Sequence, residues 1–363
     1  TDSGTTLTED GKESFFGIST DAVNEPYNHR VLYLNNNEAL VYWQDTRWGE
    51  SKIYGSKINS SFDGTSDIFS NGDINGDSLT SLPLAQDVPK AILAGNNVFL
   101  SFKVEESPNE NLYFQLLNID LSPNGNATAI ADPSTSKQGF DMVYGEDGAV
   151  YYAYSENYDI SIKKIYETGE AEWSVVAVDN SADDLIQSIY PYPGGGCVII
   201  YEFQSFIEGS HIHALAIDEN GVVRNGWPVN LSDLSGKQYY ESSVLTDNGI
   251  FISFKDNTSG DYDVYGQYLQ FNGSLMFSTS GEAIASGDND QKLSSLAYNN
   301  EQDEVFVCYE FPNGSELDIH CKEIDLSNQA LSEEIVLSSA ARDQSKPFVY
   351  WSGHSFIIAW EDT

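Results

Sequence analysis

Short apolar segments separated by turns rich in Asn and Gly recur along the whole chain. Each repeat opens with a short apolar segment that ends in such a turn, the pattern of a β-strand leading into the next strand. The seven first segments are HRVLYLNNN (29–37), PKAILAGNN (89–97), FDMVYGEDG (140–148), IQSIYPYPGG (186–195), YESSVLTDNG (240–249), LSSLAYNN (293–300) and SKPFVYWSG (345–353). Their turn ends follow one another at intervals of 47 to 60 residues, which is the sequence signature of a repeat architecture.

After each turn comes a second, more apolar segment with an aromatic residue at one fixed position. These residues are Trp43, Phe102, Tyr154, Tyr201, Phe254, Tyr309 and Trp360. A third segment with period-two alternation follows, and then a weaker fourth, as at 171–178 and 333–339. Four antiparallel strands per unit without helical periodicity predict an all-β fold built from the blades of a β-propeller.

The ends of the sequence predict how such a propeller closes. Ten residues follow the last turn end at 353, and 37 residues precede and include the first, which together make one further repeat of 47. We therefore expect a seven-bladed β-propeller whose last blade combines two N-terminal with two C-terminal strands, so that 13–20 pair with 5–11 and these pair with Phe356–Trp360. Closure leaves no open sheet edge. Residues 1–363 would form a single β-propeller domain; an open solenoid and a two-sheet sandwich are the alternatives.

The chain is strongly acidic, with 56 acidic residues, 17 basic residues and a formal net charge of −39. A charge of this sign repels nucleic acid and anionic membranes. No apolar run reaches the roughly 18 residues that span a bilayer. We expect neither a nucleic-acid partner nor direct membrane insertion, whereas cations or basic partners fit the charge.

The segment Trp43–Gly49, followed by Lys52-Ile53-Tyr54, resembles a repeat of secreted bacterial β-propeller proteins whose fuller form is W-x-D-x-R-x-G-x-x-D-I-Y-x-Q. Three other stretches match parts of this form, and one matches a D-Q-x-x-P lead: Asp263–Gln267, Asp318–His320, Trp360–Asp362 and Asp343–Pro347. The resemblance implies a scaffold or binding role in cell-surface proteins or proteins exported by type IX secretion, and it brings no catalytic residues. A buried Asp45–Arg47 pair that ties the loop is the simpler account of the motif.

Candidate metal ligands occur in the longest connection between repeats. Asp73, Asn75 and Asp77 have the one, three, five spacing of oxygen ligands in a calcium loop. Ser78 and Leu84 depart from that pattern at positions six and twelve, so a polar loop is the alternative. Calcium is the one cofactor that the sequence suggests.

The histidines and cysteines have structural interpretations. His211, His213 and His320 could form a metal or lyase site, but His213 and His320 stand where other repeats have tyrosine (Tyr54, Tyr113 and Tyr265). Three cysteines, at 197, 308 and 321, do not make a disulfide framework. A four-residue turn at 313–316 would pair Cys308 with Cys321. Proximity is expected more than a bond, because directly opposed strand positions strain a disulfide.

The loops between blades and those between second and third strands emerge on one face of a propeller, and here that face combines acids with aromatics. The candidate binding residues are Trp48, Tyr158, Phe203, Phe206, Tyr262, Asp183, Asp184 and Asp288. Acidic groups at a rim attract basic partners or cations, and exposed aromatics serve as anchors. The alternative is that the acids are solvated turn residues and that the aromatics pack under the loops.

These observations favour an extracellular, cell-surface or periplasmic binding or scaffold module that presents this loop face to a protein or glycan partner. A carbohydrate-active enzyme, either a glycoside hydrolase or a polysaccharide lyase, is one alternative. A structural component of a bacterial secretion or surface machine is another. No motif identifies catalytic residues, which favours binding over catalysis.

Overall fold

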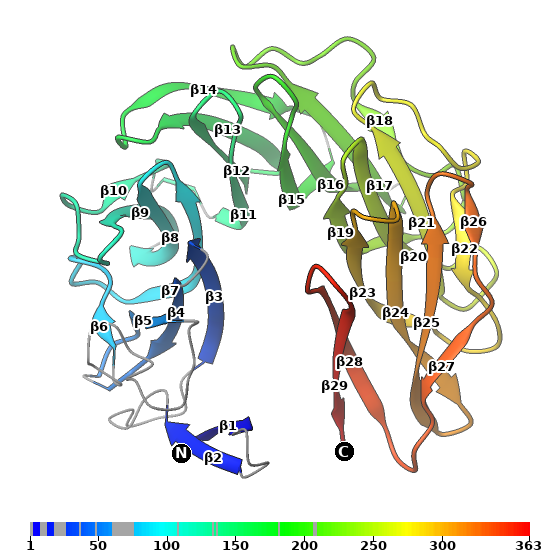
Figure 1. The fold of residues 1–363 in the computed structure, drawn as a ribbon. Helices are drawn as coiled ribbons and strands as arrows, with labels where there is room; N and C mark the ends of the chain where they lie inside the picture. Colours follow the sequence, from blue (N-terminus) through cyan, green and yellow to red (C-terminus); the bar gives the residue numbers. More distant parts are fainter. Residues whose placement is uncertain are drawn as a thin grey trace. The chain divides into compact units, whose positions relative to one another are not determined.

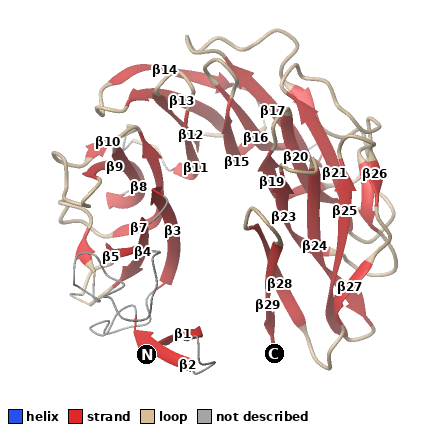
Figure 2. Cartoon of the chain, in the orientation of Figure 1, coloured by secondary structure: helices blue, strands red, loops and turns tan. Residues whose placement is uncertain are grey.

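The computed structural model describes residues 3–7, 13–17, 27–35, 38–47, 49–59, 76–106, 109–132, 134–135, 137–180, 182–205 and 209–363. Every regular element in these ranges is a β-strand (Figure 2). Within them there is no helix of the length and apolar character needed to cross a membrane.

Consecutive strands pair into antiparallel sheets (Figure 1). The first sheet contains β3 (Tyr27–Asn35), β4 (Glu38–Asp45), β5 (Lys52–Asn59) and β6 (Asp77–Ser78). The second contains β7 (Gln86–Ala94), β8 (Asn97–Glu106), β9 (Asn109–Asn118) and β10 (Thr128–Ala129). The third contains β11 (Lys137–Tyr144), β12 (Ala149–Glu156), β13 (Asp159–Tyr166) and β14 (Ala171–Val178).

The later sheets repeat this order. The fourth contains β15 (Asp183–Pro191), β16 (Cys197–Ser205), β17 (Gly209–Ile217) and β18 (Val229–Asn230). The fifth contains β19 (Gln238–Leu245), β20 (Gly249–Asp256), β21 (Asp263–Gln270) and β22 (Glu282–Ala285). The sixth contains β23 (Lys292–Asn299), β24 (Glu304–Asn313), β25 (Glu316–Asp325), β26 (Ala330–Leu331) and β27 (Ile335–Ser338). Two further pairs are β1 (Ser3–Leu7) with β2 (Glu13–Gly17), and β28 (Gln344–Trp351) with β29 (Phe356–Asp362).

Each of the seven predicted first strands is present, as β3, β7, β11, β15, β19, β23 and β28. The predicted fourth strands at 171–178 and 333–339 correspond to β14 and β27. The expected pairing at the N-terminus is also present, since Ser3 pairs with Gly17 and Leu7 with Glu13. Each terminal pair of strands forms its own two-stranded sheet, so closure and the count of seven blades stay predictions.

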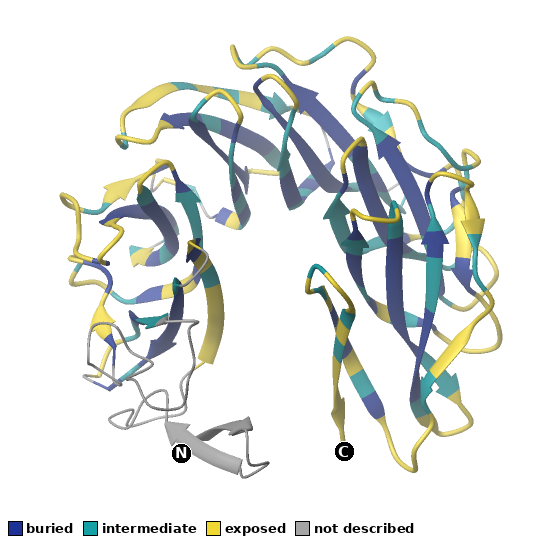
Figure 3. Ribbon diagram, viewed as in Figure 1, coloured by how far each residue is buried: buried dark blue, intermediate teal, exposed yellow. Residues whose placement is uncertain are grey.

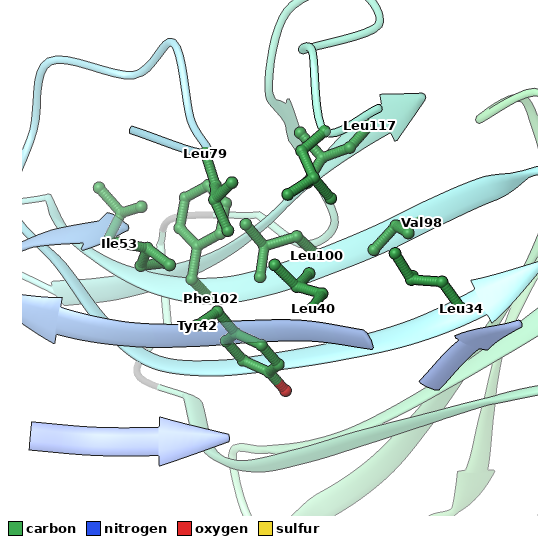
Figure 4. Close-up of a cluster of buried hydrophobic side chains, with 11 residues drawn as sticks. Leu34, Leu40, Tyr42, Ile53, Leu79, Val98, Leu100, Phe102 and Leu117 are labelled. Carbon is green, nitrogen blue, oxygen red and sulfur yellow. The ribbon is translucent and has the colours of Figure 1, made fainter. Parts of the chain in front are cut away.

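By its internal contacts the chain divides into two compact units, and the division passes through the third sheet. One unit comprises residues 1–138, 142–152 and 163–174; the other comprises 139–141, 153–162 and 175–363. In the first unit, the first two sheets bury a cluster that includes Leu40, Leu100 and Phe102 (Figure 4). In the second unit, Phe251 and Tyr309 belong to a cluster between the fifth and sixth sheets. Sheet packing on sheet is therefore the basis of both cores.

In the first, third, fifth and sixth sheets the second strand is the most buried element, because neighbouring strands lie on either side of it and apolar side chains cover its faces. In β4, β12 and β20 nearly every residue is buried, and Figure 3 shows these strands dark along their length. Strands covered on both faces read as continuous apolar runs, which explains segments such as CVIIYEF and GIFISF.

The aromatic residue of the second strand lies directly opposite a ring of the third strand. The pairs are Trp43–Tyr54, Phe102–Tyr113, Tyr201–His213, Phe254–Tyr265 and Tyr309–His320. Directly opposed rings of this kind stabilise a sheet. The prediction that His213 and His320 replace tyrosine in the repeat is therefore confirmed.

The Asp45–Arg47 pair predicted from the motif is also present. The Arg47 guanidinium forms an ion pair with the buried Asp45 carboxylate, and the Trp43 indole N–H donates to the same group at 3.1 Å. Hydrogen bonds from these donors lower the pKa of Asp45 against the opposing effect of its burial. Arg47 also lies over the Tyr54 ring, 3.8 Å from its centroid, so the motif holds its own loop together.

Cys308 and Cys321 lie directly opposite each other on β24 and β25 and form a disulfide. The predicted pairing is confirmed, and the bond, which we expected less than proximity, is present. The predicted four-residue turn was wrong: Asn313 pairs with Glu316, so the turn has two residues, Gly314 and Ser315. One more pair of opposed residues tightens the turn without changing the register.

Candidate functional site

At the start of most first strands, a buried side chain donates hydrogen bonds to the loop that leads into the sheet. The residues are Gln86, Lys137, Gln238, Gln291 and Gln344, each at most 1% exposed. Their carbonyl acceptors are Leu82, Asp132, Leu234, Asn289 and Arg342, respectively. Through these hydrogen bonds, each buried side chain holds the loop before its own sheet. We call this place the junction position.

In the fourth sheet the junction position is occupied by Asp184. The backbone N–H of Gln86 donates to the Ser51 carbonyl in the loop between the second and third strands of the preceding sheet, at 3.0 Å. Asp184 does the same with the Tyr158 carbonyl, also at 3.0 Å. The shared backbone hydrogen bond shows that an acidic side chain stands here in place of a donor.

The carboxyl group of Asp184 is fully buried. Its Oδ2 accepts a hydrogen bond from the Asn180 side-chain amide at 2.7 Å, and its Oδ1 has no partner among the described residues. Burial, with smaller contributions from the charges of Asp159 and Asp183, raises the pKa of Asp184 to about 7.

Tyr158 lies in the two-residue turn that joins β12 to β13. Asn157 and Tyr158 both have positive φ, at 51° and 76°, as a type I′ hairpin turn requires. Glycine is the usual second residue of this turn, and a bulky aromatic there is uncommon. The Tyr158 residue is 62% exposed, so its ring projects from the loop face.

Beside Tyr158 is a hollow of about 620 Å³ within the second unit. We call it the Tyr158 hollow. Its lining residues are Tyr158, Asp183, Gln204, Ser205, Gly209, Ser210, Lys237 and Tyr239. They come from the turn before β13, the start of β15, the β16–β17 hairpin and the start of β19.

A row of three polar side chains crosses the fourth sheet at this hollow. Asp183, Gln204 and Ser210 are directly opposed on β15, β16 and β17, so their side chains share one face of the sheet. Asp183 Oδ1 and Ser210 Oγ are buried without a hydrogen-bond partner in the described part of the chain. Gln204 donates to Glu202 at 2.9 Å. Burial raises the pKa of Asp183.

Aromatic rings line other parts of the hollow. The Tyr239 ring contacts Tyr262 edge to face, with 6.0 Å between ring centroids. The Lys255 ammonium lies 5.6 Å from the Tyr239 centroid and 5.4 Å from that of Tyr262. These contacts fix the ring of Tyr239, while Tyr158 stands exposed. The hollow therefore combines a held ring, an exposed ring and a row of polar groups.

No protein-family model matches the sequence, and no curated protein matches it either. Among solved structures, the chain is similar to Porphyromonas gingivalis dipeptidyl peptidase 4, with a TM-score of 0.56, 12% identity, and coverage of 98% of this chain and 54% of that one. It is similar to the BP39L lectin from Burkholderia pseudomallei, with a TM-score of 0.54, 8% identity, and coverage of 83% and 81%. It also matches a prolyl endopeptidase, with a TM-score of 0.52, 10% identity, and coverage of 91% and 46%.

The fold is β-propeller-like and all-β. At these identities the likeness concerns the fold alone. The chain spans about half the length of the two peptidases that it matches.

The structure brings two of the predicted binding residues, Tyr158 and Asp183, into the hollow. Asp184 points to the other face of β15, and Tyr262 reaches the hollow only through Tyr239. Phe203 shares the face of Asp184, where its ring packs 5.3 Å from the ring of His213. For Phe203 the alternative of packing under the loop therefore holds.

The remaining predicted residues lie elsewhere. Asp288 is exposed in the loop before β23, and its carbonyl accepts from Gln291 at 3.4 Å. Trp48 and Phe206 lie outside the described residues. So do Asp73 and Asn75, while Asp77 is exposed in β6. Within the described ranges no three His, Cys, Asp or Glu side chains gather as metal ligands. The calcium hypothesis stays a prediction.

Sequence reasoning missed Gln204, Ser205, Ser210, Lys237 and Tyr239. The signal for Gln204 and Ser210 was available, because the β16–β17 turn opposes residues whose numbers add to 414. Tyr239 was missed because the predicted first strand began at 240, whereas β19 begins at Gln238. The register of β19 shifts between Tyr240 and Ser242, and such a bulge hides the start of a strand from a period-two pattern.

Proposed function

We propose that the chain is a glycan-binding module and that the Tyr158 hollow is its binding site. The observation that carries this proposal is the meeting of two tyrosine rings with a row of polar side chains, two of which have an atom without a partner among the described residues. A sugar ring has apolar C–H faces that pack on aromatic rings and hydroxyl groups that both donate and accept hydrogen bonds. The Asp183 carboxylate accepts, the Gln204 amide does both, and so does the Ser210 hydroxyl.

The unpaired polar atoms at the hollow give a physical reason for affinity toward sugar hydroxyl groups. A buried polar atom without a partner costs about 1–3 kcal/mol, and a ligand hydroxyl that bonds to it removes this cost. Asp183 and Ser210 each have such an atom and lie in one row across the sheet face, with Gln204 between them. The strands fix the spacing of the three residues, but the two unpaired atoms are buried, so Asp183 and Ser210 must turn toward the hollow to meet a ligand hydroxyl.

Charge narrows the kind of glycan. Lys237 at the rim is one positive group beside Asp183, but the whole chain carries a formal net charge of −39. Anionic polysaccharides are repelled by a field of that sign. We therefore propose neutral or amino sugars as the ligand class.

The site favours binding over hydrolysis. Glycoside hydrolases of the usual kind use two carboxyl groups on either side of the scissile bond, about 5–10 Å apart. Asp183 lines the hollow, but Asp184 points to the opposite face of the same strand and is fully buried. The BP39L lectin, by its name a glycan-binding protein, has a similar fold, so the proposal is compatible with the architecture.

We also propose a location outside the cytoplasm. The Cys308–Cys321 disulfide supports it, because such bonds persist mainly in oxidising compartments. Membership of the secreted bacterial propeller-repeat family stays a proposal that rests on the motif at Trp43–Tyr54.

Seven-bladed closure stays a further proposal, supported by apolar side chains on the terminal sheets. In the first unit Val31 and Tyr33 on β3 are 58% and 63% exposed. In the second unit Phe348 on β28 and Ile357 on β29 are 61% and 54% exposed. Exposed apolar side chains of this kind mark surfaces that pack against further protein. Deleting residues 1–20 should then lower the melting temperature by more than 10 °C, roughly the effect of losing a few kcal/mol. An unchanged melting temperature would contradict closure.

A glycan array of neutral, amino and acidic oligosaccharides, followed by calorimetry on the ligands that bind, tests the binding function. We expect neutral or amino sugars to bind, and Asp183→Asn and Ser210→Ala each to weaken binding about tenfold, as the loss of one good hydrogen bond does. Tyr166→Ala is the matched control, because Tyr166 ends β13 at the far end from Tyr158 and is 40% exposed. Binding that survives both site variants, or no binding by any sugar class, would overturn the proposal.

A further inference from the structure

Asp184 lies behind the Tyr158 hollow without lining it, and no step of sugar binding needs its carboxyl group. We propose that Asp184 is a positioning residue that makes the hollow sensitive to pH: in its neutral form it holds the Tyr158 turn and Asp183 in the binding arrangement, and in its ionised form it releases them. The effect on affinity rests on the proposed glycan function, while the effect on the loop does not.

The junction position itself argues for the neutral form. Gln86, Lys137, Gln238, Gln291 and Gln344 all supply a side-chain donor here. An ionised carboxylate only accepts hydrogen bonds, whereas a protonated carboxyl group has one O–H to donate. Protonated Asp184 is therefore the form that resembles glutamine, and Oδ1, which has no partner in the described chain, is the atom able to carry the proton.

The surroundings of Asp184 give its negative charge little support. Asp159 on β13 and Asp183 on β15 are both acidic and act on its charge. Tyr201 on β16 senses the charge of Asp184, and His211 on β17 shares its face of the sheet across Phe203. Among the described residues, the side chain that hydrogen-bonds to the carboxyl group is that of Asn180, which is neutral. Because burial and these acids raise the pKa to about 7, the group changes charge near neutrality.

Two direct connections link the charge state of Asp184 to the Tyr158 hollow. The backbone N–H of Asp184 holds the Tyr158 carbonyl at 3.0 Å, and Asp183 is the preceding residue. Hydration of an ionised Asp184 requires residues 182–184, at the start of β15, to open, because the carboxyl group is fully buried. Opening this segment moves Tyr158 and Asp183 together, and these are an aromatic and a polar group of the site.

Hydrogen exchange with mass spectrometry on the whole protein tests the loop effect without any ligand. Peptides covering 156–160 and 180–185 are followed from about pH 5.5 to 8.5 after correction for intrinsic exchange, in the wild type and in Asp184→Gln. One proton changes opening by at most about tenfold per pH unit, so we expect wild-type protection to fall about tenfold or more across this range. In Asp184→Gln it should stay constant.

The reciprocal variant is Gln291→Asp, which should create a similar pH dependence around Tyr262. Asp184→Asn serves as a second neutral variant if Asp184→Gln does not fold. Asp183→Asn removes the neighbouring carboxylate on the other face and should keep the pH dependence. A flat wild-type profile, or an equal pH dependence in both neutral variants, would overturn the proposal.

Calorimetry with the tightest-binding oligosaccharide of the array then tests the link to affinity. We expect the wild-type dissociation constant to rise about tenfold between pH 5.5 and 8.5, and that of Asp184→Gln to stay constant. If no oligosaccharide binds but the exchange effect is present, the glycan function fails and the pH-sensitive junction stands. If a sugar binds with the same affinity at both pH values in the wild type, the coupling fails and the glycan function stands.

Discussion

The junctions at the starts of β15 and β23 share the same backbone hydrogen bond. They differ in whether the buried side chain accepts or donates a hydrogen bond. In both, a buried residue donates its backbone N–H to a tyrosine carbonyl of the preceding sheet: Asp184 to Tyr158 at 3.0 Å, and Gln291 to Tyr262 at 2.7 Å. The Gln291 amide donates to the Asn289 carbonyl at 2.8 Å, whereas Asp184 accepts from the Asn180 amide. One fold thus tolerates hydrogen bonds in either direction, but only the acidic junction can titrate.

The tyrosines at these two junctions differ in how their rings are held. Tyr262 packs edge to face on Tyr239 beneath Lys255, so its ring is held by the fifth sheet. Tyr158 is 62% exposed and is fixed through its backbone. The junction with the acidic residue is therefore also the one beside an exposed aromatic ring. Under the proposed function, a repeat position that is structural elsewhere contributes to the binding site in the fourth sheet.

The largest effect on stability is expected when Asp184 is replaced by glutamine, the residue at most other junction positions. Its pKa rises from 3.8 to about 7 on folding, so between these values the folded chain holds a proton that the unfolded chain has lost. Stability must then fall as pH rises from about 4 to 7 and stay level above, by at most about 4 kcal/mol. Asp184→Gln should remove this loss, so its stabilisation, measured by urea unfolding, should be absent near pH 4 and greatest near pH 8. A gain of equal size at both pH values would contradict this origin.

The reverse substitution, Gln291→Asp, should lower stability, and by somewhat less than Asp184→Gln raises it. Gln291→Asp removes the donor to the Asn289 carbonyl and buries a carboxyl group near Asp288 and Asp290. We expect a loss of about 2–3 kcal/mol at pH 8, with partial recovery near pH 5, where the new carboxyl group is protonated. Gln291→Asn keeps an amide on a shorter side chain and is the matched control. If the two variants are equally destabilised at every pH, side-chain length rather than charge decides.

Sequence reasoning located the seven first strands and the aromatic of each second strand, because period-two alternation and Asn-Gly turns are local signals. It also found the Cys308–Cys321 pairing, since hairpin register follows from the position of the turn. It placed Tyr158 and Asp183 on one face but could not place Gln204 and Ser210 beside them, because opposition across two hairpins depends on bulges such as that between Ile186 and Ser188. Which acid is buried depends on tertiary packing, so Asp183 and Asp184 looked alike in the sequence.

The smallest effect on stability is expected from Tyr158→Gly, a variant that removes the tyrosine ring but keeps the turn that carries it. Glycine accepts the φ of 76° at position 158 without strain, whereas tyrosine there costs about 1–2 kcal/mol. Tyr158→Gly should therefore leave the protein as stable as the wild type or up to about 1 kcal/mol more stable, after the added chain entropy of glycine in the unfolded state is subtracted. The same change removes the exposed ring of the hollow, so sugar affinity should fall about tenfold or more.

Asn157→Gly is the control: the φ of Asn157, 51°, is also positive, but Asn157 does not line the hollow, so affinity should be kept. Thermal unfolding and calorimetry on the two variants distinguish the roles. If both variants lose affinity, the shape of the turn matters rather than the ring; if neither does, Tyr158 is not a ligand contact, and the exposed tyrosine at this junction differs from Tyr262 in packing alone.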